Sequence, residues 1–188
     1  MKKLIALAIA AGISSAAFAA PETYTLEGTH SMPRFEYNHL GYSIQLSRFD
    51  KATGTITLDR AAKTGAVDIT IDTTSVDSGY PLFNQHLQAE DYFSTAQFPT
   101  ATYKSTKVNF DGDKVASVEG NPTLKGVTKP VTLTVVSFHC MPHPMLKKEA
   151  CGATATAKVK RSDFNMGKNV PYVGDEVTIT LPVEAIKM

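Results

Sequence analysis

The 188-residue chain lacks the sequence signatures of the common enzyme classes. It has no nucleophile elbow, zinc-protease helix motif, phosphate-binding loop or dinucleotide fingerprint, so no motif favours catalysis or a catalytic cofactor. It has no run of five or more basic residues, so no charge pattern favours nucleic acid or an anionic membrane surface as partner. It has no domain linker, internal repeat or low-complexity tract, and we therefore expect a single domain.

A short apolar run stands at the start of the chain. Lys2 and Lys3 precede the run, which covers residues 4–11, and Ala17-Phe18-Ala19 forms a small-x-small cleavage site. Because a bilayer-spanning helix needs about 20 apolar residues, this pattern predicts a cleaved signal peptide over residues 1–19 and not a stable membrane anchor. Residues 20–188 are then expected in the periplasm. Cleavage removes two of the 19 basic residues and none of the 18 acidic ones, which takes the net charge to −1.

The chain has two cysteines, Cys140 and Cys151. An oxidising compartment makes a disulfide the default for such a pair. The bond would close a loop of about a dozen residues and contribute on the order of 3 kcal/mol in the loop-entropy model. We expect it to join the two strands of a hairpin, because about 170 residues are enough to bury a core without it.

Turn signals recur about every ten residues, and the residues between them alternate. The turn signals are Thr53-Gly54, Thr64-Gly65, Ser78-Gly79-Tyr80-Pro81, Asp111-Gly112-Asp113, Gly120-Asn121-Pro122, Lys125-Gly126 and Val173-Gly174-Asp175. The alternating segments are Thr55–Leu58, Val67–Ile71, Val131–Val135 and Val177–Leu181. Such segments are half-buried strands with one dry face, and their spacing predicts an all-β sandwich or barrel. The period alone does not decide between these two architectures.

The alternation breaks over residues 81–96. Phe83 and Leu87 stand four apart there, and Pro81 suits a first helical position, so we predict one short helix. The whole chain is then about eight strands plus this helix. Eight strands can close into a barrel wide enough for one small ligand.

A series of short motifs extends from about Tyr24 to Ala185. They are His30-Ser31, Phe35, His39-Leu40-Gly41, Gly54-Thr55-Ile56, residues 72–77, residues 86–93, Phe98-Pro99, residues 103–106, residues 124–131 and residues 161–166. Their order and spacing resemble the YceI-like family, lipocalin-like barrels whose characterised members bind polyisoprenoid or related long-chain lipids. The resemblance implies a single eight-stranded antiparallel lipocalin-like β-barrel with one short helix. The cysteine pair further resembles a subset that includes ubiquinone-binding members from Gram-negative bacteria.

The chain departs from the family pattern in two places. The family often carries a charged pair just before its helical His-Leu, where this chain has Phe83-Asn84. A neutral head group such as a quinone fits that change better than a pyrophosphate. Pro33 falls within the first strand of the pattern, where it removes a ladder donor and indicates a strand start, an edge or a bulge.

The ligand-binding residues are predicted from strand parity and from the helical segment. With a period of two, Phe35, Tyr37 and His39 share one face of their strand, while charged residues mark the other. The predicted set is Phe35, Tyr37, His39, Ile56, Ile69, Ile71, His86, Leu87, Phe93, Phe98, Tyr103 and Leu133. Tyr37, His39 and His86 are the candidates for the lipid head group, although each could equally be an ordinary structural residue.

We therefore expect a non-enzymatic periplasmic carrier of a long-chain isoprenoid lipid, of polyprenyl or ubiquinone type. No catalytic residue and no metal site is predicted for it. Ser31 beside His30 is no exception, because neighbours in a strand point to opposite faces and cannot act as nucleophile and base. A homodimer stays open, since one sequence does not reveal a free strand edge.

One loop supports a different function. Residues His139 to Met145 contain two imidazoles, a thiol and two thioethers, and copper prefers soft sulfur together with imidazole. A periplasmic copper-binding protein is therefore the alternative. The expected disulfide counts against it, because the bond would consume the thiol of Cys140.

Overall fold

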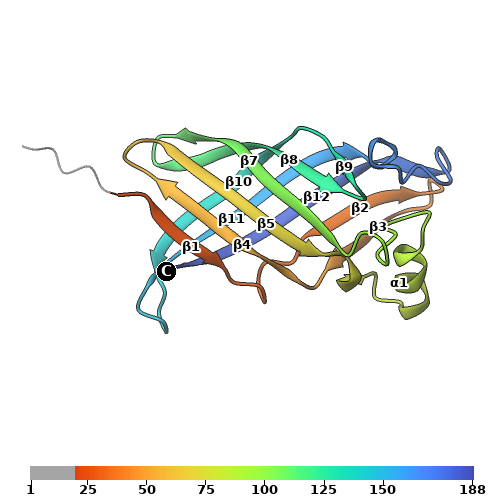
Figure 1. Cartoon of the computed structure of the whole chain (residues 1–188), viewed down its shortest axis with the longest axis horizontal. Helices are drawn as coiled ribbons and strands as arrows, with labels where there is room; N and C mark the ends of the chain where they lie inside the picture. The colour runs from red at the N-terminus through yellow and green to blue at the C-terminus, as the bar shows by residue number, and fades with distance from the viewer. Residues whose placement is uncertain (1–19) are drawn as a thin grey trace, which may run out of the picture.

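The computed structural model describes residues 20–188, in which strands predominate (Figure 1). The predicted signal peptide, residues 1–19, lies outside the described residues. The strands are β1 (Glu22–Leu26), β2 (Arg34–His39), β3 (Ser43–Phe49), β4 (Ala52–Asp59), β5 (Thr64–Asp72), β6 (Val76–Asp77), β7 (Thr100–Asp111), β8 (Lys114–Leu124), β9 (Val127–Thr128), β10 (Val131–Pro142), β11 (Glu149–Lys160) and β12 (Val173–Lys187). The helices are α1 (Pro81–Gln88) and two short 3₁₀ turns, η1 (Thr73–Ser75) and η2 (Arg161–Phe164).

The strands close into an eight-stranded antiparallel barrel. Hydrogen-bonded neighbours follow the order β1, β4, β5, β7, β8, β10, β11 and β12, and β12 returns to β1 through the pair Leu26 and Ala185. The expected barrel is confirmed. A sandwich is excluded because this pairing leaves no break between two sheets.

Two short strands, β1 and β2, share the same edge of the long strand β12. β12 pairs with β1 at its C-terminal end and with β2 along its N-terminal half, and β2 continues into a hairpin with β3. Pro33 directly precedes β2, so it marks a strand start, one of the three readings of that residue. The sequence does not predict the separate strand β1.

The alternating segments all lie in strands, as predicted. In β12, Val177, Ile179 and Leu181 line the interior, whereas the threonines between them do not. This arrangement follows from the period of two in an extended chain, which sends successive side chains to opposite faces. The barrel therefore has an aliphatic inner surface.

Four of the seven predicted turns are wrong, because their residues lie in strands: Thr53-Gly54 in β4, Thr64-Gly65 in β5, Gly120-Asn121-Pro122 in β8 and Val173-Gly174-Asp175 in β12. Gly54 lies inside β4 with φ of +154°, and Gly120 lies inside β8. A Cβ atom at Gly54 would stand 2.2 Å from the carbonyl oxygen of Asp68, and one at Gly120 would stand 2.6 Å from the ring of Tyr103. These glycines allow close approach of a neighbouring strand or ring. Glycine is common both in turns and at such close contacts, so the sequence alone does not tell the two apart.

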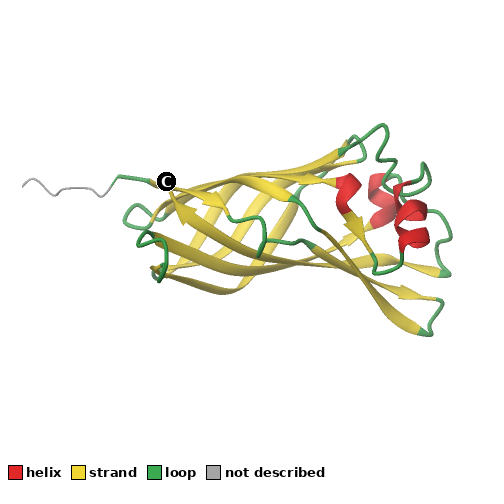
Figure 2. Ribbon diagram, turned by 90° about the horizontal axis from the view of Figure 1, so that it is seen from below, coloured by secondary structure: helices red, strands yellow, loops and turns green. Residues whose placement is uncertain are grey.

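The helix begins at Pro81, as predicted, but ends at Gln88 and not at Ala96. Ala89 takes an extended conformation with ψ of 166°, and the following residues form turns. Figure 2 shows the helical segments gathered at one end of the barrel and the C terminus at the other. We call these the helix end and the disulfide end. Among residues 20–188 no helix has the length and apolar character that crossing a membrane requires.

Candidate binding cavity

A cavity of about 460 Å³ lies inside the barrel. Its wall extends from Tyr24, Leu58 and Cys151 at the disulfide end to Phe83 and Tyr92 at the helix end. Most of the lining side chains are aliphatic or aromatic, because every strand of the barrel turns its apolar face inward. A long apolar molecule matches the chemistry of this wall.

Eleven of the twelve predicted ligand-binding residues border this cavity. They are Phe35, Tyr37, His39, Ile56, Ile69, Ile71, His86, Leu87, Phe93, Tyr103 and Leu133. Strand parity and, for His86, Leu87 and Phe93, the helical segment thus predicted residues of the wall, and the binding role of all eleven stays a prediction.

The structure does not place Phe98 on the cavity wall. A Cβ atom at Gly126, in the turn after β8, would stand 2.9 Å from the Phe98 ring, so the ring packs against this turn. The main chain of Phe98 is held by two hydrogen bonds, from its N–H to Ser94 and from the Thr73 hydroxyl to its carbonyl. These contacts direct the ring away from the interior, which corrects the prediction for this residue.

The mouth of the cavity lies at the helix end. Four lining residues are exposed, namely Arg34, His39, His86 and Asn169. At the disulfide end, the lining residues Tyr24, Leu58 and Cys151 are buried, and none of the described lining residues there is exposed. A ligand therefore has an entrance beside α1, within the part of the chain that the structure describes.

The helix is anchored over the mouth by aromatic packing. Leu87 is only 4% exposed, and the ring centroid of Phe93 lies 5.6 Å from that of Phe35 and 5.2 Å from that of Phe49. Offset and edge-to-face contacts at such distances are favourable beyond their buried area. The tertiary structure therefore fixes α1 as part of the wall.

His86 lies in the mouth between two aromatic rings. Its centroid is 5.9 Å from that of Phe83 and 4.9 Å from that of Tyr92. The Tyr92 hydroxyl accepts a hydrogen bond of 3.2 Å from the amide of Asn169. The predicted set leaves out Phe83, Tyr92 and Asn169. Phe83 lies in α1, and Tyr92 and Asn169 lie in turns, where no strand period applies, although Tyr92 belongs to the motif over residues 86–93.

Arg161 is a buried cation on the cavity wall, also missed by strand parity. Its guanidinium donates to the carbonyl oxygens of Gly174 and Val173 at 2.8 Å, of Lys168 at 2.9 Å, and of Met166. Burial lowers the pKa of Arg161 below its ordinary value. The carbonyl oxygens solvate the charge, and no lining residue is an aspartate or glutamate.

The two inward tyrosines differ in their partners. The Tyr103 hydroxyl donates to the carbonyl oxygens of Val118 at 2.9 Å and Val131 at 3.2 Å, and burial raises its pKa to about 12. The Tyr37 side chain is 9% exposed and its pKa is raised mainly by burial, but its hydroxyl forms no hydrogen bond with any residue from 20 to 188. Tyr37 thus presents an unused donor to the cavity.

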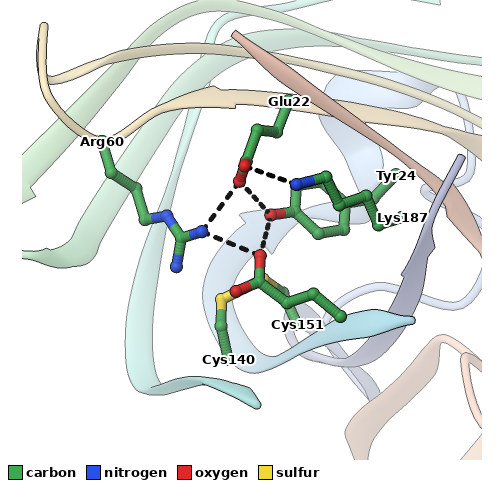
Figure 3. Close-up of a disulfide and its surroundings, with 7 residues drawn as sticks. Glu22, Tyr24, Arg60, Cys140, Cys151 and Lys187 are labelled. Atoms are coloured by element: carbon green, nitrogen blue, oxygen red, sulfur yellow. Dashed lines mark hydrogen bonds and ion pairs between the residues drawn. A yellow bond between two sulfur atoms is a disulfide. The ribbon is translucent and has the colours of Figure 1, made fainter. Parts of the chain in front are cut away.

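The opposite end is closed by a disulfide and a polar network (Figure 3). Cys140 in β10 and Cys151 in β11 face each other in the ladder and form the predicted disulfide. The Arg60 guanidinium donates to Glu22 and Glu149, each at 2.8 Å. This network lies beyond the buried floor of the cavity.

Tyr24 and Lys187 complete the network. The Tyr24 hydroxyl lies within hydrogen-bonding distance of Glu22 and Glu149, and the Lys187 ammonium donates to Glu22. The hydrogen bonds from Lys187, Tyr24 and Arg60 lower the pKa of Glu22 to about 2. Burial, followed by the two carboxylates, raises the pKa of Tyr24 well above its ordinary value.

The structure engages two of the potential ligand atoms of the copper alternative. The disulfide holds Cys140, and the Nδ1 atom of His143 accepts hydrogen bonds from the main-chain N–H groups of Met145 and Leu146. In residues 20–188, the one cluster of three potential ligands from histidine, cysteine and acidic residues lies elsewhere.

That cluster, Glu27, His30 and Glu184, forms ion pairs. The Nδ1 atom of His30 lies 2.6 Å from the Glu27 carboxylate, which raises the pKa of His30. Ser31 is turned away, with its hydroxyl bonded to the main chain of Glu184. His30 and Ser31 therefore do not form a nucleophile and base pair.

A closed antiparallel barrel around an apolar cavity with a mouth at one end defines a lipocalin-like class of protein. The sequence pattern of the YceI-like domain matches residues 24–185. Protein YceI of Escherichia coli O157:H7 is 36% identical over 189 residues, which cover 99% of this chain and 98% of that protein. The chain belongs to the YceI-like family.

Solved structures share this architecture. BcnA of Burkholderia cenocepacia is 26% identical with a TM-score of 0.71, over 85% of this chain and 99% of that one. A polyisoprenoid binding domain from Saccharophagus degradans is 17% identical with a TM-score of 0.65, over 88% of this chain and 98% of that one. At that identity the second comparison shows the fold alone.

Proposed function

We propose that this protein is a periplasmic, non-enzymatic carrier that holds one long-chain isoprenoid lipid, of polyprenyl or ubiquinone type, in the barrel. The observation that carries the proposal is the apolar cavity of about 460 Å³, which extends from the buried floor at Tyr24 to the mouth at His86. Its volume falls in the range of roughly 300–1,000 Å³ occupied by ligand sites. Membership of the YceI-like family and the fold shared with a polyisoprenoid binding domain support this choice of ligand.

The energetics of burial are sufficient without an ion pair. Burying about 20 chain carbons contributes roughly 16 kcal/mol at about 0.8 kcal/mol per carbon. Association and ordering cost roughly 4 to 15 kcal/mol. The tail therefore supplies the affinity, and the polar groups near the mouth only have to select the head group.

The polar groups favour a head group that accepts hydrogen bonds. Tyr37 presents a free hydroxyl, Arg161 a positive charge and Asn169 an amide, while no lining residue carries a carboxylate. The side chain of Asn84 bonds to Ser78 and Asp77, so the Phe83-Asn84 pair offers no charge to the ligand. The carbonyl oxygens of a quinone suit this environment.

The periplasmic location is supported by the signal peptide predicted for residues 1–19. The disulfide between Cys140 and Cys151 is consistent with an oxidising compartment. Fractionation of cells that express the full chain tests this part, since a protein recovered uncleaved in the cytoplasm contradicts it.

Native mass spectrometry of the protein purified from a Gram-negative periplasm tests the ligand. We expect one bound prenyl lipid or quinone per chain, released and identified after organic extraction. An empty protein that also takes up no added polyprenol or quinone contradicts the proposal.

A pair of matched variants tests the location of the ligand. Ala155 lies on the cavity wall between the lining residues Val135 and Leu181, whereas Ala66 is exposed and does not line the cavity. Ala155→Phe should fill part of the cavity and lower quinone uptake at least tenfold, and Ala66→Phe should leave it unchanged. Equal uptake by two folded variants places the ligand outside the barrel.

A further inference from the structure

The hairpin of β2 and β3 carries an unusual amount of exposed apolar surface at its tip. Every residue from Asn38 to Leu46 is exposed, including Leu40 at 47%, Tyr42 at 86%, Ile44 at 60% and Leu46 at 50%. Residues 37–47 contain no lysine, arginine, aspartate or glutamate. Contiguous apolar surface of this kind marks an interaction site more often than a random exposed residue does.

This surface borders the mouth of the cavity. The same hairpin turns Phe35, Tyr37 and His39 to the cavity wall. The main-chain N–H of Leu40 donates to the carbonyl oxygen of Tyr172 at 3.0 Å, which brings a second exposed tyrosine to the tip. We call Leu40, Tyr42, Ile44, Leu46 and Tyr172 the mouth rim. The apolar surface of the rim thus borders the entrance to the apolar interior.

Within the described residues, the tip is attached to the barrel along its β2 edge only, through the pair of His39 with Val173 and the hydrogen bond of Leu40 to Tyr172. β3 pairs with β6 only through Arg48 and Phe49, so residues 43–47 have no strand neighbour on their second edge in the described part of the chain. Figure 1 shows this hairpin at the same end as α1, opposite the C terminus. The rim therefore lies at the open end of the barrel, where a flat surface can approach it.

We infer that the mouth rim docks on the interfacial region of a lipid bilayer, an inference that rests on the proposed carrier function. An isoprenoid that leaves a bilayer for the cavity avoids water only if the mouth touches the bilayer. Tyrosine and aliphatic side chains are those that enter the headgroup boundary, and residues 37–47 carry no charge whose hydration would be lost there. The charge of Glu36 lies opposite Leu46 at the base of the tip. The rim therefore binds neutral bilayers by insertion and does not need anionic lipid.

The far end of the barrel provides a contrast. Met145 and Leu146 are also exposed, at the tip of the hairpin between β10 and β11, but Lys147 and Lys148 follow them directly. This tip lies at the closed end, away from the mouth (Figure 1). It serves as an internal control for exposed apolar residues.

Vesicle flotation with phosphatidylcholine alone tests the inference. We expect the unaltered protein to float with the vesicles, and Ile44→Gln with Leu46→Gln to lower the bound fraction about tenfold or more, because two aliphatic side chains no longer insert. Met145→Gln with Leu146→Gln should bind as the unaltered protein does. Equal losses in the two double variants, or no binding by the unaltered protein, overturn the inference.

Three further readouts separate the inference from its alternatives. Lipid occupancy, measured by native mass spectrometry, should be unchanged in the Ile44 and Leu46 double variant. Loss of vesicle binding with occupancy retained shows that the rim acts in docking on the bilayer and not in holding the lipid in the cavity. Binding that requires phosphatidylglycerol and disappears at 0.5 M salt, where the Debye length is roughly seven times shorter than at 0.01 M, overturns the inference. Sedimentation that shows a dimer converted to a monomer by the same variant also overturns it, because a second copy then covers the rim.

Discussion

Tyr37 and Tyr103 both face the cavity, but only one of their hydroxyls is available to a ligand. The Tyr103 hydroxyl is held by two main-chain carbonyl oxygens, so it stabilises the packing of β7 on β8 and β10. The Tyr37 hydroxyl has no such partner among residues 20–188. At the scale of single residues, we therefore expect the selection of a head group to depend on Tyr37.

The variant Tyr37→Phe tests this role. It removes the hydroxyl and keeps the ring, so we expect a three- to tenfold weaker Kd for a quinone, which corresponds to one neutral hydrogen bond of about 0.5–1.5 kcal/mol. Isothermal titration with a short-chain quinone measures the change. Tyr103→Phe is the control, with an unaltered Kd and a loss of about 1 kcal/mol in the free energy of unfolding. Weaker quinone binding in Tyr103→Phe alone would mean that Tyr103, and not Tyr37, contacts the head group.

Glu22 makes the stability of the barrel dependent on pH. Its pKa in the folded protein is about 2, below the ordinary value of 4.5, because Lys187, Tyr24 and Arg60 donate to its carboxylate. The unfolded chain therefore binds more protons between these values, and stability falls as the pH falls through that range. We expect Glu22→Gln to lower the free energy of unfolding by about 1–3 kcal/mol at pH 7.

Glu22→Gln should also make stability fall less steeply in acid, because it removes the carboxylate whose protonation destabilises the fold. Urea denaturation at several pH values from 6 to 3 measures this change. Some acid dependence should persist, because the hydroxyl of Thr29 and the ring of His30 contribute to lowering the pKa of Glu27 to about 2 as well. Glu36→Gln is the control, since Glu36 forms no ion pair with the described residues. If stability falls equally with pH in the unaltered protein, Glu22→Gln and Glu36→Gln, Glu22 does not contribute to the pH dependence.

At the scale of elements, only one face of α1 packs against the barrel. Leu87 is buried beside Phe93, whereas Leu82 on the same helix is exposed. We expect Leu87→Ala to lower the free energy of unfolding by about 2–5 kcal/mol and to speed the release of bound lipid, because the helix forms part of the mouth. Leu82→Ala should change stability by less than about 0.5 kcal/mol.

Denaturant titration and a lipid-transfer assay measure these two quantities for the helix variants. A faster release without loss of stability would show that Leu87 contacts the lipid more than the barrel. Equal behaviour of the two alanine variants would contradict the packing of α1 on the mouth.

Local sequence patterns predict some elements of this fold and not others. The inner face of β2 and β12 followed from the period of two, because one side of each strand is dry. The length of α1 did not follow, since Ala89 takes an extended conformation although no glycine or proline stands there. Gly54 and Gly120 resemble turn residues in sequence but serve contacts between strands.

The polar part of the cavity was the harder part to predict. Arg161 satisfies its donors with carbonyl oxygens from residues 166–174, and only the folded loop brings these together. Its presence in the motif over residues 161–166 was the available signal. Likewise, Phe98 looked like a wall residue because it is aromatic and precedes Pro99, whereas its position depends on the distant turn at Gly126.

At the scale of the whole molecule, the two ends of the barrel have opposite chemistry. The disulfide end is cross-linked and carries the ionic network of Glu22, Arg60 and Lys187. The helix end carries the mouth, with polar groups at Tyr37 and His86 and apolar groups around them. A lipid that enters through this mouth places its tail toward Tyr24 and its head near α1.

Photo-crosslinking with two isoprenoid quinones tests that orientation. A diazirine beside the quinone ring should label residues 81–92, which include His86 and Tyr92 in the mouth, whereas a diazirine at the end of the tail should label the floor near Leu58 and Val115. Peptide mapping identifies the labelled segments. The reverse pattern would mean that the lipid enters head first, so that its head lies against the buried Tyr24 and the donors of the mouth select nothing. Leu58 and Val115 on the floor are apolar, and the Tyr24 hydroxyl is already bonded to Glu22 and Glu149. Desolvation of the quinone oxygens there would go uncompensated, so the distribution of polar groups favours the tail-inward pose.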